Sequence, residues 1–353
     1  MGLREYVIRR CVYMLLLIIA VVSFNFFLFR LPTFFFGADP ISLMITDELS
    51  RVLTQDLLEQ MYANFGLVLN PDIFDWIYMF WRYLVSMLTG NFGVSFLAQR
   101  PVIDLIVERL PNTLLLMGSA SMVSILMGMW IGIKVASDPG SKKDLGAVTS
   151  ALFIYSLPYF WLGMMLLMIF SYALPQWTES VFGIAIGFPQ QHTISYDIWE
   201  MARTHPLGAI MVAGDILYHL FLPMMTLAIG AFGYWFLYTR NNLVTVMTED
   251  YILTARAKGL DENQILYKHG LKNAMLPMVT LIALAFGGLI TGTVLIETVF
   301  TWRGLGAFIF ESLIALDYPV VQAIFMIIAI VTILANFIAD LLYGVLDPRI
   351  KYG

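Results

Sequence analysis

The chain has 353 residues, of which 59% are hydrophobic and only 13% charged, and its formal net charge is −5. Soluble domains carry about 25% charged residues, so this composition, with a mean hydropathy of +0.79, excludes an ordinary water-soluble protein. The small net charge and the dispersed basic residues exclude a nucleic-acid-binding surface. Cys11 is the only cysteine, which excludes an intrachain disulfide and a cysteine metal cluster.

The apolar stretches predict an all-α polytopic membrane protein with six transmembrane helices. A helix rises about 1.5 Å per residue, so crossing roughly 30 Å of hydrocarbon takes about 20 apolar residues. The first stretch is long and bulky and no small-x-small pattern follows it, so we interpret it as a retained span and not as a secretory signal. Pro158 and Pro223 are expected to kink the third and fourth spans. The predicted spans are 12–29, 113–135, 147–174, 216–238, 274–299 and 320–342.

The placement of charge predicts the orientation in the membrane. Basic residues precede the first span and follow the second, namely Arg4, Arg9, Arg10, Lys142 and Lys143. Cytoplasmic loops carry an excess of such residues, so these positions are expected inside. The segments 30–112 and 175–214 are richer in acidic than in basic residues and are expected outside. An even number of spans then leaves both termini in the cytoplasm, including the tail 343–353.

The spans divide the chain into two predicted regions. Residues 1–112 form an N-terminal transmembrane helix followed by a long extracytoplasmic segment, and residues 113–353 form a core of five spans. Within this core, 175–214 is an extracytoplasmic insertion and 240–273 is a polar cytoplasmic loop. No tandem repeat or low-complexity tract interrupts this arrangement.

The long outer segment is expected to contain short helices that lie at the membrane interface. Aromatic residues cluster in it at Trp76, Tyr78, Trp81 and Tyr83. Such residues suit an interfacial aromatic belt, although simple packing explains them equally well.

The polar loop between the fourth and fifth spans is the most informative part of the chain. A short amphipathic helix is predicted over 251–258, because Ile252, Ala255 and Gly259 fall on one stripe. Gly259 is expected to end this helix in the left-handed conformation, and Asp261 to cap a second helix that runs to the end of the loop. Two short helices at a glycine corner would form a compact knob projecting from the membrane.

The residues of this knob resemble the cytoplasmic "EAA" coupling loop of ABC importer permeases, in the version of the dipeptide, oligopeptide and nickel branch. The matching residues are Tyr251, Thr254, Ala255, Arg256, Ala257, Lys258, Gly259 and Leu260. Leu253 departs from the general motif, which has a glutamate there. The resemblance extends over nearly the whole chain, through Gly90-Asn91-Phe92-Gly93, Glu108-Arg109-Leu110-Pro111-Asn112-Thr113, Glu297-Thr298-Val299-Phe300, Asp317-Tyr318-Pro319 and Leu346-Asp347-Pro348-Arg349-Ile350.

The resemblance implies a type I ABC importer permease fold in the inner membrane of a prokaryotic cell. It implies that the chain forms a translocation path for di- or oligopeptides together with a second homologous permease, and that the path opens to either side in turn. Two ATP-binding subunits would dock on the knobs, and an extracytoplasmic solute-binding protein would deliver the cargo. The chain lacks a Gly-x-x-x-x-Gly-Lys-Ser/Thr loop, so it is not expected to be an enzyme or to hold a cofactor. ATP and Mg²⁺ would be used by the partner subunits.

Other functions are open at this point. The same machinery imports short oligosaccharides or nickel complexes in related systems, and the sequence identifies no substrate-binding residue. A stand-alone secondary carrier is the main alternative of another class, but such carriers usually show internal repeats and ionisable residues at mid-membrane. An intramembrane enzyme would need a nucleophile and base or a metal set, and no such motif is present. The four histidines lack metal-ligand spacing, so no metal site is predicted.

Two acidic residues lie near span ends. Glu297 and Asp340 are candidates for gating or for pairing with the second permease. The alternative is that each carboxylate only reaches out to water, as charged groups near helix ends often do.

Overall fold

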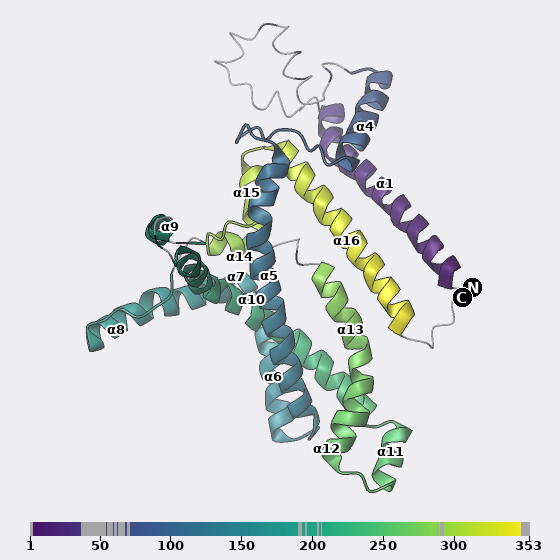
Figure 1. Ribbon diagram of the computed structural model, residues 1–353, viewed down its shortest axis with the longest axis vertical. Helices are drawn as coiled ribbons and strands as arrows, with labels where there is room; N and C mark the ends of the chain where they lie inside the picture. Colours follow the sequence, from purple (N-terminus) through teal and green to yellow (C-terminus); the bar gives the residue numbers. More distant parts are fainter. Residues whose placement is uncertain are drawn as a thin grey trace. The chain divides into compact units, whose positions relative to one another are not determined.

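A computed structural model describes residues 3–36, 54, 59, 62, 68, 71–189, 193, 194, 196–202, 205, 207–287, 289 and 293–346. Regular structure in these ranges is helical, apart from an isolated antiparallel bridge between Val94 and Pro101. The chain divides into two compact units, one made of residues 1–110 and 308–353 and the other of residues 111–307. The ribbon in Figure 1 follows the chain through both.

The first unit is built on two long helices, α1 (Leu3–Phe36) and α16 (Tyr318–Leu346), which pack along each other. The shorter helix α4 (Ile73–Leu88) packs on α1. Phe26 is buried between them, and its ring centroid lies 5.3 Å from that of Phe80 and 5.4 Å from that of Tyr83. Asn25 on α1 donates a hydrogen bond from Nδ2 to the carbonyl oxygen of Gln322 on α16 at 3.1 Å. Apolar and polar contacts thus both hold α1 in this unit.

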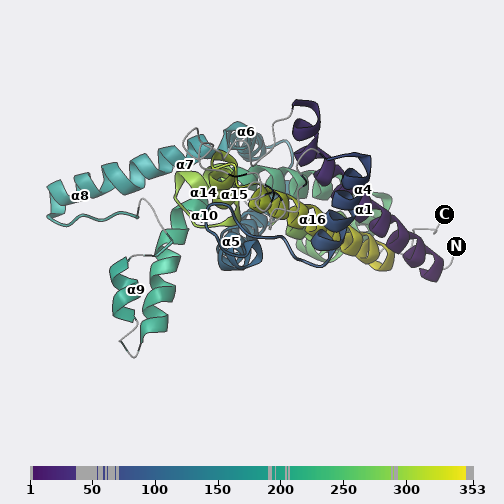
Figure 2. The ribbon, with the colours of Figure 1, turned by 90° about the horizontal axis from the view of Figure 1, so that it is seen from above.

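The second unit is organised around α10 (Gly208–Val246), which packs against α6, α7, α9, α13 and α14. Figure 2 shows α9 running beside the start of α10. Small residues permit close approach, since a Cβ at Gly128 would lie 2.5 Å from Cβ of Trp235, and one at Gly230 would lie 1.9 Å from the ring of Tyr159. The remaining helices have these bounds: α5 Val102–Ala136, α6 Lys142–Ser156, α7 Tyr159–Leu167, η2 Met168–Ala173, α8 Leu174–Phe182, α9 Tyr196–Ala202, α13 Leu271–Gly287, α14 Val294–Val299 and α15 Leu305–Ile314.

The third predicted span, 147–174, is wrong as a single kinked helix. Helix α6 ends at Ser156, Leu157 is extended with φ −76° and ψ 136°, and Pro158 caps the start of α7. The residue before a proline is pushed out of the helical region, so the chain breaks here instead of bending. Beyond this break, α7 continues through a π-helical turn into α8, giving an apolar helical run over Tyr159–Phe182. The insertion predicted from residue 175 therefore begins as helix.

Among the described residues, five helices are long and apolar enough to cross a membrane. The predicted fifth span, 274–299, is not one continuous α-helix, because Leu289 lies in a 3₁₀ turn and Thr293 is extended with φ −127° and ψ 92°. Helix α13 covers its first part and the short α14 its last part. The count of six spans and the orientation of the termini remain predictions. The five helices are Ile8–Arg30, Val102–Ala136, Tyr159–Phe182, Gly208–Val246 and Tyr318–Ile338.

Candidate functional site

The predicted knob is present, and its first helix is α11 (Asp250–Ala257). Lys258 caps the end of this helix, and Gly259 follows with φ +74°, a left-handed conformation that glycine adopts without strain. The Gly259 amide donates a hydrogen bond to the carbonyl oxygen of Arg256 at 2.9 Å. The helix over 251–258 and its glycine end are confirmed to within one residue.

The second helix starts as predicted but does not end within the loop. The carboxylate of Asp261 accepts a hydrogen bond from the Asn263 amide at 3.0 Å, which caps the helix. The helix then runs through α12 (Glu262–Gln264) and the π-helical turn η3 (Ile265–Gly270) directly into α13. The expected end of this helix near Asn273 is wrong, because the helix continues through Gly270 and Asn273 into α13. The second helix of the knob is therefore the N-terminal extension of α13.

Apolar contacts hold the two helices of the knob together. Ile252 and Ala255 of α11 are buried against Ile265, with Met247 and Leu260 at the edge of this small core. The predicted stripe is confirmed for Ile252 and Ala255, whereas Gly259 is exposed. The Asn273 side chain donates from Nδ2 to the Tyr251 hydroxyl at 2.8 Å, so α11 is also tied to α13.

The opposite face of α11 is open. Thr254 and Ala257 are exposed, and so is Leu253, which stands where the general motif has a glutamate and is 67% exposed. Arg256 lies beside this face and forms an ion pair with Glu262, with Nε and Oε1 2.9 Å apart. Both side chains are largely exposed, so this pair adds little stability. The outward face is therefore small, and it carries the exposed carboxylate of Asp250 one turn before Thr254.

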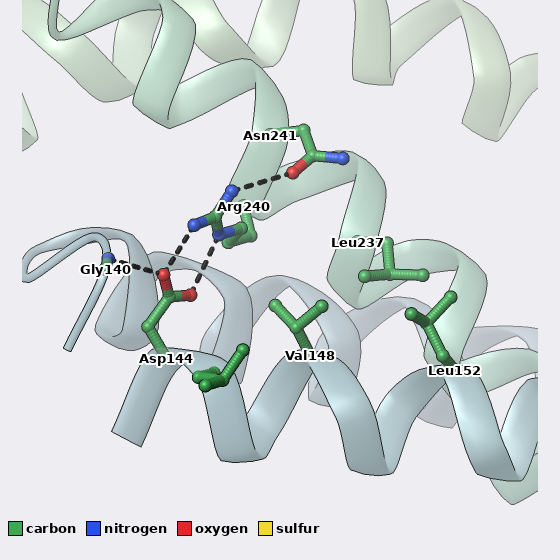
Figure 3. A pocket seen from close by; sticks show the side chains of 8 residues that line it. Gly140, Asp144, Val148, Leu152, Leu237, Arg240 and Asn241 are labelled. Atoms are coloured by element: carbon green, nitrogen blue, oxygen red, sulfur yellow. Dashed lines mark hydrogen bonds and ion pairs between the residues drawn. The ribbon is translucent and has the colours of Figure 1, made fainter. Parts of the chain in front are cut away.

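A buried ion pair joins α6 to α10 at the base of the knob. The Asp144 carboxylate accepts hydrogen bonds from Arg240 Nε at 2.9 Å and from Nη2 at 2.5 Å (Figure 3). The Gly140 amide donates to the same carboxylate at 2.8 Å, and Gly140 itself is left-handed with φ +82°. The hydrogen bonds from Arg240, with that from Gly140, hold the pKa of Asp144 below its usual value.

The ion pair closes one end of an open groove of about 420 Å³ between α6 and α10. Val148, Leu152 and Leu237 form its apolar wall, as Figure 3 shows. The sequence pattern predicted Lys142 and Lys143 only as charges that set orientation, and Arg240 only as the start of a polar loop. The signal it missed was the acidic Asp144 immediately after the two lysines, since a carboxylate among inside-loop cations needs a partner when it is buried.

Glu297 is fully buried and holds a corner of the second unit. Its Oε1 accepts a hydrogen bond from the Thr113 hydroxyl at 3.1 Å, and its Oε2 accepts one from the Ala307 amide at 2.9 Å. Thr113 in turn accepts from the Leu305 amide at 2.7 Å. The corner is tight, because a Cβ at Gly304 would lie 2.5 Å from both Glu297 Oε2 and Thr113 Oγ1.

This geometry separates the two acidic residues that the sequence suggested for gating or subunit pairing. Glu297 does not reach out to water but binds backbone and side-chain donors of its own chain. The side chain of Asp340 lies outside the described ones. The motif around Glu297 was visible in the sequence, but its partner Thr113 is 184 residues away and no local pattern connects the two.

The first unit contains a comparable buried carboxylate, Asp317, just before α16. It accepts hydrogen bonds from the Ser95 hydroxyl at 2.5 Å, the Phe96 amide at 3.0 Å and the Leu97 amide at 3.2 Å. It thereby fixes the loop between α4 and α5. Over the described residues, no group of three or more His, Cys, Asp or Glu side chains is placed to hold a metal ion.

Comparison with known proteins identifies the family. The profile described as "Binding-protein-dependent transport system inner membrane component" matches residues 124–352. The oligopeptide transport system permease protein AppB of Bacillus subtilis (strain 168) is 32% identical over 98% of this chain and 99% of its own length. The glutathione transport system permease proteins GsiC of Salmonella paratyphi A and of Escherichia coli (strain K12) are 34% and 32% identical, each over 99% of both chains. This multi-pass membrane protein therefore belongs to the family of inner-membrane components of binding-protein-dependent transport systems.

Proposed function

We propose that this chain is one of the two permease subunits of an ATP-driven importer and that the importer carries peptides. The full-length similarity to proteins named for oligopeptide and glutathione transport supports the peptide cargo. Import of short oligosaccharides or nickel complexes by the same machinery is the second candidate, because related systems of this branch carry them. Cells that depend on this importer should take up labelled peptides, and uptake of a nickel complex alone would favour the second candidate.

The single observation that carries the proposal is the exposed face of α11 on a knob whose two helices share a small buried apolar core. Leu253, Thr254 and Ala257 point away from the buried contact of Ile252 and Ala255 with Ile265. A small exposed helix face of this kind fits a groove on a soluble protein. We assign that groove to the ATP-binding subunit and the contact to the exposed members of the predicted set, Tyr251, Thr254, Arg256, Ala257, Lys258 and Gly259, which the buried Ala255 supports from inside the knob.

The connections of the knob explain how force would reach the membrane. The knob follows α10 directly at Met247, and its second helix continues into α13 without a break. A displacement of α11 would therefore be passed to both α10 and α13, and the hydrogen bond from Asn273 to the Tyr251 hydroxyl ties α11 to α13. Closure of the ATPase pair would tilt these helices and open the path alternately to the two sides. The partner subunits bind ATP and Mg²⁺, and this chain forms one side of the translocation path.

We place the chain in the membrane with six spans and both termini in the cytoplasm. Helix α13 and the segment after it form the fifth crossing, which puts the knob inside the cell. A second permease completes the path, and a solute-binding protein delivers cargo from outside. The basic residues of the knob and of the loop at Lys142 support this orientation.

Co-purification tests the docking. In Ala257→Trp a bulky side chain covers the exposed face of α11, and we expect the ATP-binding subunits to be lost from the purified complex. Asn263→Trp adds the same bulk on the exposed second helix, outside that face, and should retain them. Equal retention by both variants would remove α11 from the contact, and absence of an ATPase from the unaltered complex would favour a secondary carrier.

Labelling tests the orientation. Lys258→Cys in a Cys11→Ser background provides one reactive thiol on the knob. A membrane-impermeant maleimide should label it in inside-out vesicles and leave it unlabelled in intact cells. Labelling in intact cells would put the knob outside and end the proposal.

A further inference from the structure

Helix α4 of the first unit has a wide apolar face that no described residue covers. Its side chains divide into three sectors at about 100° per residue. One sector is buried and holds Met79, Tyr83 and Met87, and a narrow polar sector holds Asp75, Arg82 and Ser86. The third sector is apolar and exposed, each side chain between 44% and 75%; we call it the α4 stripe, made of Ile73, Phe74, Ile77, Tyr78, Trp81, Val85 and Leu88.

The α4 stripe continues the apolar surface of α1. Phe80 borders the stripe, and its ring stacks on that of Phe27 with a centroid distance of 6.2 Å. Phe27 is itself 49% exposed, and Phe24 and Leu28 beside it are exposed as well. Helix α1 is long and apolar enough to cross a membrane. The stripe therefore adjoins the exposed apolar surface of a candidate membrane span.

Length and charge decide how α4 can meet the bilayer. Its 16 residues extend only about 24 Å, which is short of the roughly 30 Å hydrocarbon core. Asp72 and Asp75 form a capping box at its first turn, which needs water nearby. Arg82 lies at the border of the stripe with its guanidinium carbon 5.9 Å from the centre of the Tyr78 ring, so its stem covers apolar surface while its charge can reach the headgroups. A helix with these three sectors lies in the interface and does not span.

We propose that α4 is a membrane-interface anchor, whose stripe is immersed among lipid acyl chains at the end of α1 while its polar sector faces water. The ligand is the acyl-chain region of the leaflet in which α1 ends. The aromatic residues of this helix then have two different roles. Tyr78 and Trp81 lie in the stripe and form an interfacial belt, whereas Trp76 and Tyr83 pack against Phe26 of α1. This goes beyond the proposed import function and does not depend on the cargo.

Spin labels test the anchor in the full-length chain, reconstituted in nanodiscs with its partner subunits. Cys11→Ser removes the native thiol, and a nitroxide is attached at Ile77→Cys, Trp81→Cys or Arg82→Cys. Oxygen partitions into acyl chains, whereas a nickel chelate stays in water, so the logarithm of the ratio of their collision rates reports immersion. We expect it to be positive at positions 77 and 81 and negative at position 82, the matched control on the polar sector.

Two outcomes would overturn the anchor. A negative value at positions 77 and 81 would place the stripe in water. Low collision rates with both reagents, seen only when the partners are present, would mean that a protein surface covers the stripe. Labels at positions 77 and 81 that are immobile in the complex and mobile in the chain alone would support that second outcome. None of these results bears on whether the knob binds an ATPase.

Discussion

Asp144 and Arg240 are joined by two hydrogen bonds although 96 residues separate them in the sequence. Asp144 lies in the first turn of α6, and Arg240 lies within the last turns of α10 before the knob. The pair therefore fixes the loop after α5 to the helix that carries the knob. It thereby supports α10 close to the point where this helix meets the knob.

Removal of either partner should destabilise the protein. Asp144→Asn keeps the shape but leaves a half-buried guanidinium without its carboxylate, and the reverse holds for Arg240→Gln. We expect each to cost about 1–3 kcal/mol, as for hydrogen bonds to charged groups. The thermal unfolding midpoint of the detergent-solubilised complex measures this loss. The double variant should fall no further than the worse single one, because the two changes remove one interaction. Asp138→Asn, in the same loop but exposed, is the control and should behave as the unaltered chain.

The same pair predicts an acid dependence of stability. Arg240 holds the pKa of Asp144 below its usual value, so the folded state prefers the ionised carboxylate more than the unfolded state does. Its contribution is complete above the unfolded pKa of about 3.9 and is lost as the pH falls through the lowered one. The difference in unfolding midpoint between the unaltered chain and Asp144→Asn should therefore be constant from neutral pH to about pH 5 and should shrink below about pH 4. A difference that grows on acidification would contradict the ion pair.

Gly259 should be replaceable only by residues that tolerate its backbone. Proline requires φ near −65°, whereas this position has φ +74° and its amide donates to Arg256. Gly259→Pro should insert normally and lose the coupling of ATP hydrolysis to transport. Gly259→Asn is the control, because asparagine adopts the left-handed region at low cost and open space surrounds the position. Uptake and ATPase rates in proteoliposomes measure both, and normal uptake by Gly259→Pro at normal expression would contradict the role of the corner.

The corner around Glu297 should not accept a methyl group at Gly304. A Cβ there would lie 2.5 Å from Glu297 Oε2 and from Thr113 Oγ1, so the hydrogen bonds between them must shift. Overpacking of this kind costs about 1–3 kcal/mol. Gly304→Ala should lower the unfolding midpoint of the purified complex. Gly118→Ala in α5 is the matched control, since nothing lies within 4 Å of its added Cβ, and alanine suits a helix.

Asp317 should protect two specific amides. The Phe96 amide binds Oδ1 of Asp317 and the Leu97 amide binds Oδ2, so Asp317→Asn, which retains one oxygen and has an amino group in place of the other, leaves an acceptor for only one of them. Hydrogen exchange of the amide that loses its acceptor should accelerate, by roughly tenfold for each 1.4 kcal/mol of lost local stability. Asp104→Asn, an exposed acidic residue nearby in sequence, should leave both amides unchanged. Equal protection in the two variants would show that the loop is held by other contacts.

The membrane helices illustrate how far sequence patterns reach. Hydropathy located the apolar runs, but α10 extends to Val246, beyond the predicted end of the fourth span at residue 238. The polar residues after that point still form helix because backbone bonding continues when the chain leaves lipid. Pro158 shows the opposite error, where an apolar run was predicted as one helix and the chain breaks. A proline is visible in a sequence, but whether it bends a helix or separates two depends on what packs around it.

A membrane protein with a two-helix knob is predictable from local patterns alone, down to the left-handed Gly259 and the cap at Asp261. These features are local, since span length, helix periodicity and cap chemistry each involve residues within a few turns of one another. The partners of the buried carboxylates are not predictable in this way: Asp144 binds Arg240, Glu297 binds Thr113 and Asp317 binds the loop at Ser95. A buried carboxylate needs hydrogen-bond donors. Which donors reach it depends on how helices far apart in the sequence pack together, and no local pattern encodes that packing.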